Sequence, residues 1–130
     1  MGAQSPGVTR PKSKPKRVAR PAVAPEADVV AETMLALSRI GALVMRNNSG
    51  ALRNVTGRLV RFGLVGSADI IACHRGRFVA VECKRARKLP SPDQTHYAGA
   101  VMEAEGIYAL VRSQAEAQLL AEYLVGGMSL

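Results

Sequence analysis

The sequence predicts an α/β fold with a mixed sheet flanked by helices. Three observations predict it. Helical and strand patterns alternate along the chain, a tight turn joins two strands near its middle, and capping sequences mark two of the helices. The expected order of elements is helix, strand, two-stranded hairpin, helix, strand, helix.

The first helix is expected over residues 26–40, where apolar side chains recur at helical spacing. A proline before its acidic first turn and a glycine after its end are typical start and stop signals. A short strand over 42–46 follows, and 47–50 have turn chemistry. Residues 51–67 are rich in Gly and Arg, so we expect an irregular basic loop that contains at most one short strand.

The clearest signal is a hairpin with strands at 68–73 and 78–84 and a turn at 74–77. His74 falls in this turn and is expected at the surface, whereas Cys73 and Cys83 are expected to be small core residues. The alternation of the second strand places four side chains on one face: Phe78, Ala80, Glu82 and Lys84.

Capping sequences define the two remaining helices. Ser91 and Gln94 form a capping box around Pro92, which starts a helix that runs to about residue 105. A strand is expected over 107–112. Ser113 and Glu116 then form a second capping box, and the last helix runs to about residue 125: a C-terminal helix beyond the last strand.

Composition limits the possible functions. The chain has 130 residues, with 18 Lys and Arg against 10 Asp and Glu, and its formal net charge is +8. Its apolar stretches are far shorter than the roughly 18 residues of a membrane span, so we expect no contact with a membrane. Two cysteines cannot build a disulfide framework or a four-thiolate zinc site. The N-terminus lacks the apolar region of a secretory signal, so the expected location is cytoplasmic.

The positive charge is concentrated in two segments. Residues 1–25 hold six basic residues and no acid, and we expect a disordered basic tail there, followed by one folded domain over 26–130. The tail either serves solubility or holds phosphates. Between Arg46 and Lys88 lie ten basic residues but only two acids, Asp69 and Glu82. Two carboxylates would weaken a surface built only to bind a polyanion.

These two acids lie at adjacent ends of the expected hairpin strands. Side chains paired across a hairpin lie within about 4.5–8 Å of each other, and two carboxylates at that distance need a counter-charge. A hard divalent cation supplies it, and the backbone carbonyl of Cys83 can add a third oxygen. Mg²⁺ fits such oxygen ligands better than Zn²⁺. With Lys84 to orient water or neutralise charge, the expected reaction is metal-assisted phosphodiester hydrolysis.

At these residues the sequence resembles the PD-(D/E)XK nuclease superfamily, in particular its VRR-NUC branch. The resemblance covers roughly residues 26–118 and rests on five motifs: GSADII at 66–71, VECK at 81–84, RNNSGA at 46–51, RFG at 61–63 and SPDQ at 91–94. It implies the restriction-endonuclease-like αβββαβ core of that superfamily. Ala68 stands where the motif has proline, which provides backbone shape and no ligand.

The resemblance also implies roles for individual residues. Asp69 and Glu82 match the metal-binding carboxylates, and Lys84 matches the catalytic lysine. Gln94 matches a glutamine near the active site, although its capping box is a sufficient structural role. Glu26 matches an acid that bears on the metal from the first helix, where a simple first-turn acid is the alternative and Glu32 is a rival.

The resulting expectation is an endonuclease that needs Mg²⁺ or Mn²⁺ and cuts DNA, with branched DNA such as four-way junctions as an extrapolation from stand-alone family members. Cutting two symmetric strands needs two active sites, which favours a homodimer. The alternative is a non-catalytic basic nucleic-acid-binding protein. The residues expected to contact DNA are basic or amide side chains around the acidic pair: Arg46, Asn47, Arg53, Arg58, Arg61, Arg85, Arg87 and Lys88.

Overall fold

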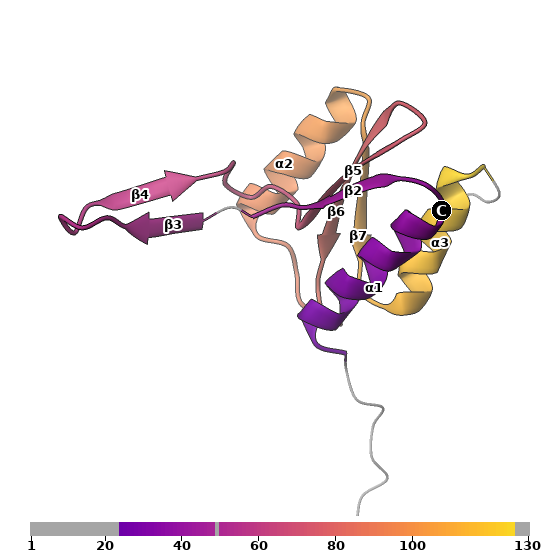
Figure 1. The fold of residues 1–130 in the computed structure, drawn as a ribbon, viewed down its shortest axis with the longest axis horizontal. Coiled ribbons are helices and arrows are strands. Elements are labelled where there is room, and N and C mark those ends of the chain that lie inside the picture. Colours follow the sequence, from indigo (N-terminus) through magenta and orange to yellow (C-terminus); the bar gives the residue numbers. More distant parts are fainter. Residues whose placement is uncertain (1–23, 49, 127–130) are drawn as a thin grey trace, which may run out of the picture.

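A computed structural model describes residues 24–48 and 50–126, so almost all of the expected tail over 1–25 lies outside the described residues. None of the described helices is long and apolar enough to cross a membrane. The described elements follow the chain in this order (Figure 1): α1 (Glu26–Arg39), β2 (Leu43–Arg46), β3 (Gly50–Arg53), β4 (Leu59–Phe62), β5 (Ile70–His74), β6 (Arg77–Cys83), α2 (Pro92–Glu103), β7 (Ile107–Val111) and α3 (Gln114–Leu124).

The main sheet has four strands in the order β2-β5-β6-β7. β2 and β6 both run antiparallel to β5, while β7 runs parallel to β6 after the crossover through α2. The predicted mixed sheet is therefore confirmed. Because β5 begins where β6 ends, the start of β5 and the end of β6 lie at the same end of the sheet.

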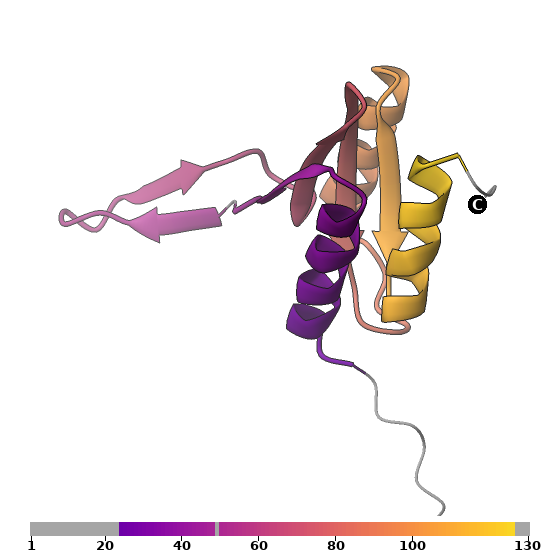
Figure 2. The ribbon, with the colours of Figure 1, turned by 45° about the vertical axis from the view of Figure 1, so that its right-hand side comes forward.

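Helices cover both faces of this sheet. Figure 2 shows α1 and α3 side by side on one face and α2 on the other. The larger core lies under α1 and α3 and includes Leu37, Val81 and Leu120, which are almost fully buried. A smaller core lies under α2 and includes Ala80 and Val101. Alternate residues of β6 thus enter different cores, as predicted, and Glu82 shares the α2 side with Ala80.

The tight turn between β5 and β6 consists of Arg75 and Gly76, whose φ angles are 53° and 79°. Two positive φ angles are typical of the hairpin turn that matches strand twist. The prediction of a surface His74 is wrong. This residue is the last of β5 and is only 3% exposed, because it shares the buried face of Ala72. The prediction of a core Cys73 is also wrong, since Cys73 is exposed, whereas Cys83 is buried as predicted.

The first predicted capping box is confirmed. The Ser91 hydroxyl accepts from the Gln94 amide, and the Gln94 side chain accepts from the Ser91 amide. The second is incomplete. Ser113 accepts from the Glu116 amide, but the Glu116 carboxylate accepts from the amide of Arg112, one residue before the cap.

Residues 50–62 form a separate two-stranded sheet of β3 and β4, which we call the arm. Figures 1 and 2 both show it projecting away from the main sheet. The prediction of an irregular loop with at most one short strand over 51–67 is therefore wrong. Its described side chains are all exposed, so no buried face imposes the alternation of apolar and polar residues that identifies a strand in a sequence.

The chain returns from the arm to the body through Gly66, which has a φ of +79°. A Cβ atom at this position would lie 2.5 Å from the backbone of Asp93, in the first turn of α2. Only glycine permits this close approach, which fixes the segment leading to Asp69 against the start of α2.

Candidate active site

Asp69 and Glu82 lie at the end of the sheet where β5 begins and β6 ends. The ladder between β5 and β6 ends with the pair Ile70 and Val81, and Asp69 and Glu82 are the next residues on its two sides. The structure therefore brings together the two acids that the sequence analysis singled out, although 13 positions separate them along the chain.

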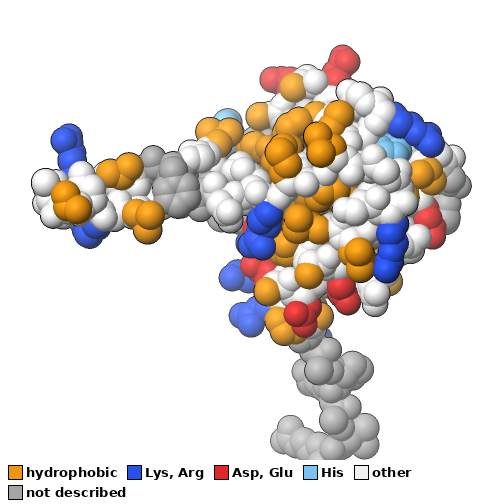
Figure 3. All heavy atoms as spheres, in the orientation of Figure 1, with side chains coloured by type: hydrophobic (Ala, Val, Ile, Leu, Met, Phe, Trp, Pro, Cys, Tyr) orange, Lys and Arg blue, Asp and Glu red, His pale blue; other side chains and the backbone are white. Residues whose placement is uncertain are grey.

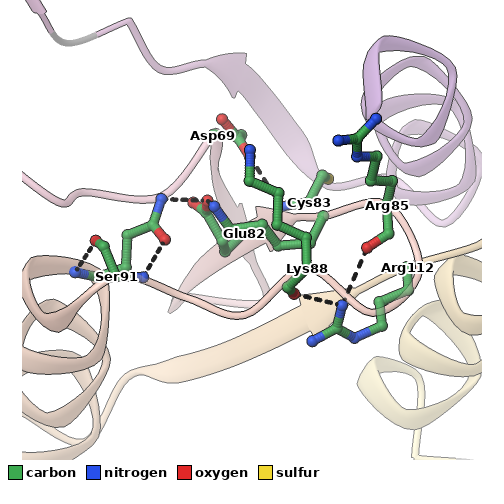
Figure 4. Close-up of polar contacts among 9 residues, drawn as sticks. Asp69, Glu82, Cys83, Arg85, Lys88, Ser91 and Arg112 are labelled. Atoms are coloured by element: carbon green, nitrogen blue, oxygen red, sulfur yellow. Dashed lines mark hydrogen bonds and ion pairs between the residues drawn. The ribbon is translucent and has the colours of Figure 1, made fainter. Parts of the chain in front are cut away.

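The carboxylate of Asp69 accepts a hydrogen bond from a backbone amide of β6 that has no partner on β5. Its Oδ2 accepts from the backbone amide of Cys83 at 2.8 Å (Figure 4), an amide that a longer β5 would have bonded. Asn47 braces the same segment: its backbone amide donates to the Asp69 carbonyl at 2.8 Å, and its Nδ2 donates to Ser67 Oγ at 2.8 Å and to the Ala68 carbonyl at 2.7 Å. The position of Asp69 is thus held from both sides.

Glu82 is only 3% exposed, and both of its polar side-chain contacts fall on one oxygen. Oε2 lies 3.5 Å from Lys84 Nζ and accepts from Gln94 Nε2 at 2.7 Å. Oε1 is buried and has no hydrogen-bond partner among the described residues. A buried carboxylate oxygen without a partner costs free energy, so this atom calls for a ligand.

The surroundings of Glu82 and Cys83 disfavour negative charge on their side chains. Burial raises the pKa of Glu82 to about 7, with repulsion from Asp69 as the second cause, while Lys84 acts in the opposite direction. Burial also raises the pKa of the Cys83 thiol to about 12, and the nearby acids add to this shift. The Cys83 sulfur is therefore a neutral thiol that packs against Thr33, and only its carbonyl is available as a hard ligand.

Gln94 combines its capping contact with a hydrogen bond to Glu82. Its Oε1 accepts from the Ser91 amide in the capping box, while its Nε2 donates to Glu82. One side chain thus ties the start of α2 to the acidic pair, as Figure 4 shows beside Ser91. The cap fixes the amide orientation, so the nitrogen faces the carboxylate.

Sequence reasoning missed Arg112. Its Nη1 donates to the carbonyls of Arg85 at 3.1 Å and Lys88 at 2.7 Å, and so clamps the loop between β6 and α2 (Figure 4). This loop carries Lys84 at one end and leads to Gln94 at the other. No sequence signal could have identified the clamp, because its acceptors are backbone carbonyls 27 and 24 positions away.

Glu26 begins α1 and acts on Glu82 only as the last of the causes that raise its pKa. Within residues 24–48 and 50–126, no three side chains of the types His, Cys, Asp and Glu come together to hold a metal. Glu26 thus acts on Glu82 through its charge, and its expected role at a metal stays a prediction. Glu32, the rival for that role, is half-buried on the same helix.

Most of the residues expected to contact DNA lie in the open. Figure 3 shows basic side chains on the body and at the arm, and the exposed ones are Arg46, Arg53, Arg58, Arg85, Arg87 and Lys88. The last three line a hollow in the loop after β6. Asn47 is half-buried and its amide nitrogen is used in bracing Asp69. The side chain of Arg61 lies outside the described part.

Comparison with protein-family models and with curated proteins finds no match to this chain. The assignment of a function therefore depends on the geometry and chemistry of the site.

Proposed function

We propose that this protein is a metal-dependent endonuclease that hydrolyses phosphodiester bonds in DNA, of the VRR-NUC type within the PD-(D/E)XK superfamily, and that it acts in the cytoplasm. One observation carries the proposal: Glu82, whose buried Oε1 has no hydrogen-bond partner among the described residues, lies beside Asp69 and Lys84 in a basic region of the chain.

The order of elements supports this proposal. α1, β2, β5, β6, α2 and β7 follow one another as in the αβββαβ core that the resemblance implies, with the arm inserted between β2 and β5. The acidic residues lie where β5 begins and β6 ends, and Gln94 lies at the start of the next helix.

The donors at the site fit a hard divalent cation. Asp69, Glu82 and the Cys83 carbonyl offer oxygen atoms, and one oxygen of Glu82 has no other partner among the described residues. Mg²⁺ or Mn²⁺ bound here would polarise the scissile phosphate and favour ionisation of the attacking water. The thiol of Cys83 takes no part, because its pKa is raised to about 12.

Lys84 and Gln94 both contact Glu82 Oε2: Lys84 brings a positive charge and Gln94 a hydrogen-bond donor. Lys84 is 7% exposed, and its ammonium lies 3.5 Å from Glu82 Oε2. There it can orient water or stabilise the negative charge that builds on the phosphate in the transition state. Gln94 holds Glu82 Oε2 and so leaves Oε1 free for a ligand. The exposed basic residues hold the DNA backbone.

The direct test is cleavage of a labelled four-way junction and of a linear duplex with Mg²⁺, with Mn²⁺ or with EDTA. The proposal predicts cleavage that requires either metal. Metal-independent binding without cleavage under any of these conditions would instead identify a non-catalytic nucleic-acid-binding protein.

Lys84→Ala should abolish cleavage but leave DNA binding nearly intact, because it removes transition-state stabilisation and at most one phosphate contact. Lys88→Ala removes the same charge from the same loop, so it is the matched control. It should weaken binding slightly and leave the rate at saturating DNA unchanged. Equal losses of binding and cleavage in Lys84→Ala would contradict its role. Thermal unfolding of both variants separates this effect from misfolding.

We further propose that the active form is a homodimer that cuts branched DNA, since symmetric cuts in two strands need two active sites related by a two-fold axis. Sedimentation of the full-length protein measures its mass directly. A monomer that nevertheless cuts both strands of a junction in one encounter would exclude this arrangement.

A further inference from the structure

We propose that the arm is a DNA-binding ribbon, and that its tip presents Val55 as an apolar wedge against the base pairs of a duplex beside the active site. The choice of DNA rests on the proposed function. The inference goes beyond that function because it names the surface that binds the duplex and the side chain that contacts the base pairs.

The arm makes no visible contribution to the core of the folded body. β3 and β4 pair only with each other, and no arm residue belongs to either described core. Leu52 and Val60 face each other across the two strands but remain 66% and 46% exposed. An isolated two-stranded hairpin has only marginal stability in water, so this element is best explained by a partner that covers it.

The charge of the arm favours a polyanion as that partner. Residues 47–68 contain three arginines and no acid. Arg53 and Arg58 flank the tip, and both are exposed. A DNA backbone carries one negative charge about every 1.7 Å along its axis, and a two-stranded ribbon fits a DNA groove.

The tip is built to hold one apolar side chain outward. Asn54 Oδ1 accepts from the amides of Thr56 and Arg58 at 3.0 and 2.9 Å, and from the Thr56 hydroxyl at 2.7 Å. Arg53 Nη1 donates to the Gly57 carbonyl at 2.9 Å. Within this fixed turn, Val55 is fully exposed. Apolar side chains on groove-binding proteins insert between base pairs and unstack them, and a fixed turn lowers the entropy cost of doing so.

The arm also leaves the body next to the catalytic residues. Its first strand follows Asn47, whose backbone amide donates to the Asp69 carbonyl, and its second strand returns to Asp69 through Gly66. Residues 50 and 55 are five steps apart, so an extended chain between them spans at most about 17 Å, or about five base pairs. The wedge therefore contacts the same duplex as the active site.

Fluorescence of 2-aminopurine tests the wedge. Short duplexes, each with a single 2-aminopurine at a different position, are titrated with the full-length protein in EDTA, which prevents cleavage. We expect a rise in fluorescence at one position, loss of that rise in Val55→Ser, and full retention in Val125→Ser. Val125 is also an exposed valine, 40% accessible, and follows α3.

The salt dependence of binding tests the arginines. Arg53→Gln with Arg58→Gln should lower the slope of log Kd against log salt by about 1.8, since two phosphate contacts are lost. Arg39→Gln with Arg75→Gln removes the same charge from exposed positions outside the arm and should leave the slope unchanged. Arg58→Gln alone, which disturbs none of the described side-chain hydrogen bonds, should lower it by about 0.9.

The outcomes separate this inference from the proposed function. If the wild type cleaves DNA but neither set of arm variants differs from its control, the arm inference is wrong and the nuclease stands. If binding depends on the arm but no metal supports cleavage, the nuclease proposal fails and the arm stands. Arm variants that change the sedimenting mass and not the salt slope would overturn the inference in favour of a second copy as the partner.

Discussion

A buried carboxyl group costs the folded protein free energy when it ionises without full compensation, and Glu82 is such a group. Its burial and the neighbouring Asp69 raise its pKa to about 7, against 4.5 for an unperturbed group. Lys84 and Gln94 compensate only one of its two oxygens. The residual cost is reasonable in a protein that binds a cation there, because the cation removes it.

The pH dependence of stability follows from this shift. Glu82 keeps its proton in the folded state up to about pH 7, whereas the unfolded chain releases it near pH 4.5. Its contribution is thus fully present below pH 4.5 and is lost as the pH rises through about 7. We expect Glu82→Gln, which cannot ionise, to gain stability relative to the wild type over this range, by at most about 3 kcal/mol.

Urea unfolding of both proteins in EDTA, at about pH 5 and about pH 8, measures this difference while other titrating groups cancel. A difference in unfolding free energy that does not change with pH would show that the carboxyl group is not perturbed. Added Mn²⁺ should restore the stability of the wild type at the higher pH and leave Glu82→Gln unaffected.

At the residue level, the sequence indicated the two acids but not the residues that hold them in place by hydrogen bonds. Asp69, Glu82 and Lys84 could be singled out because two acids stand alone among ten basic residues and alternation places them at strand ends. The brace from Asn47 could not be predicted, because its acceptors lie 20 and 21 positions away. The same residue looked like a DNA contact from its sequence neighbours alone.

At the level of elements, local signals predicted well wherever the chain packs against a core. The helices and the β5–β6 hairpin follow from capping residues, turn glycines and apolar periodicity. The arm was missed because none of its residues belongs to the two described cores, so burial imposes no alternation of apolar and polar side chains on its sequence. Absence of a buried face also explains why the arm is free to carry Leu52, Val55 and Arg58 in the open.

The loop between β6 and α2 leads to a prediction at this level. Arg112→Ala removes both hydrogen bonds that fix the loop, so Lys84 and Gln94 are less well positioned. We expect the single-turnover cleavage rate to fall by about tenfold or more, while Kd for DNA changes little. Arg112→Lys should rescue only part of the rate, because an ammonium lacks the planar guanidinium fork.

Arg77→Ala is a suitable control for that experiment, since Arg77 also donates to a backbone carbonyl, that of Leu124, but at the opposite end of the sheet. It should lower stability without lowering the cleavage rate at a temperature where the protein is folded. If Arg112→Ala and Arg77→Ala behave alike, the clamp is merely structural.

At the level of the whole molecule, the features on which the proposed function rests lie at one end of the sheet. β5 begins and β6 ends there, the arm leaves the body there, and the exposed basic loop after β6 lies beside them. The opposite end carries the β5–β6 turn and the end of α1. This difference between the two ends of the sheet follows from the order and direction of the strands. The net charge of the chain could not have predicted it, because basic residues lie at both ends of the sheet.

Calorimetric titration of the metal-free protein with Mn²⁺ tests whether Asp69 and Glu82 together hold a divalent cation, as we propose. We expect saturable binding by the wild type, lost in Asp69→Asn and in Glu82→Gln, and unchanged in Asp93→Asn, which alters an exposed acid in the first turn of α2. Binding that survives both site substitutions, or no binding by the wild type in the presence or absence of DNA, would contradict this proposal.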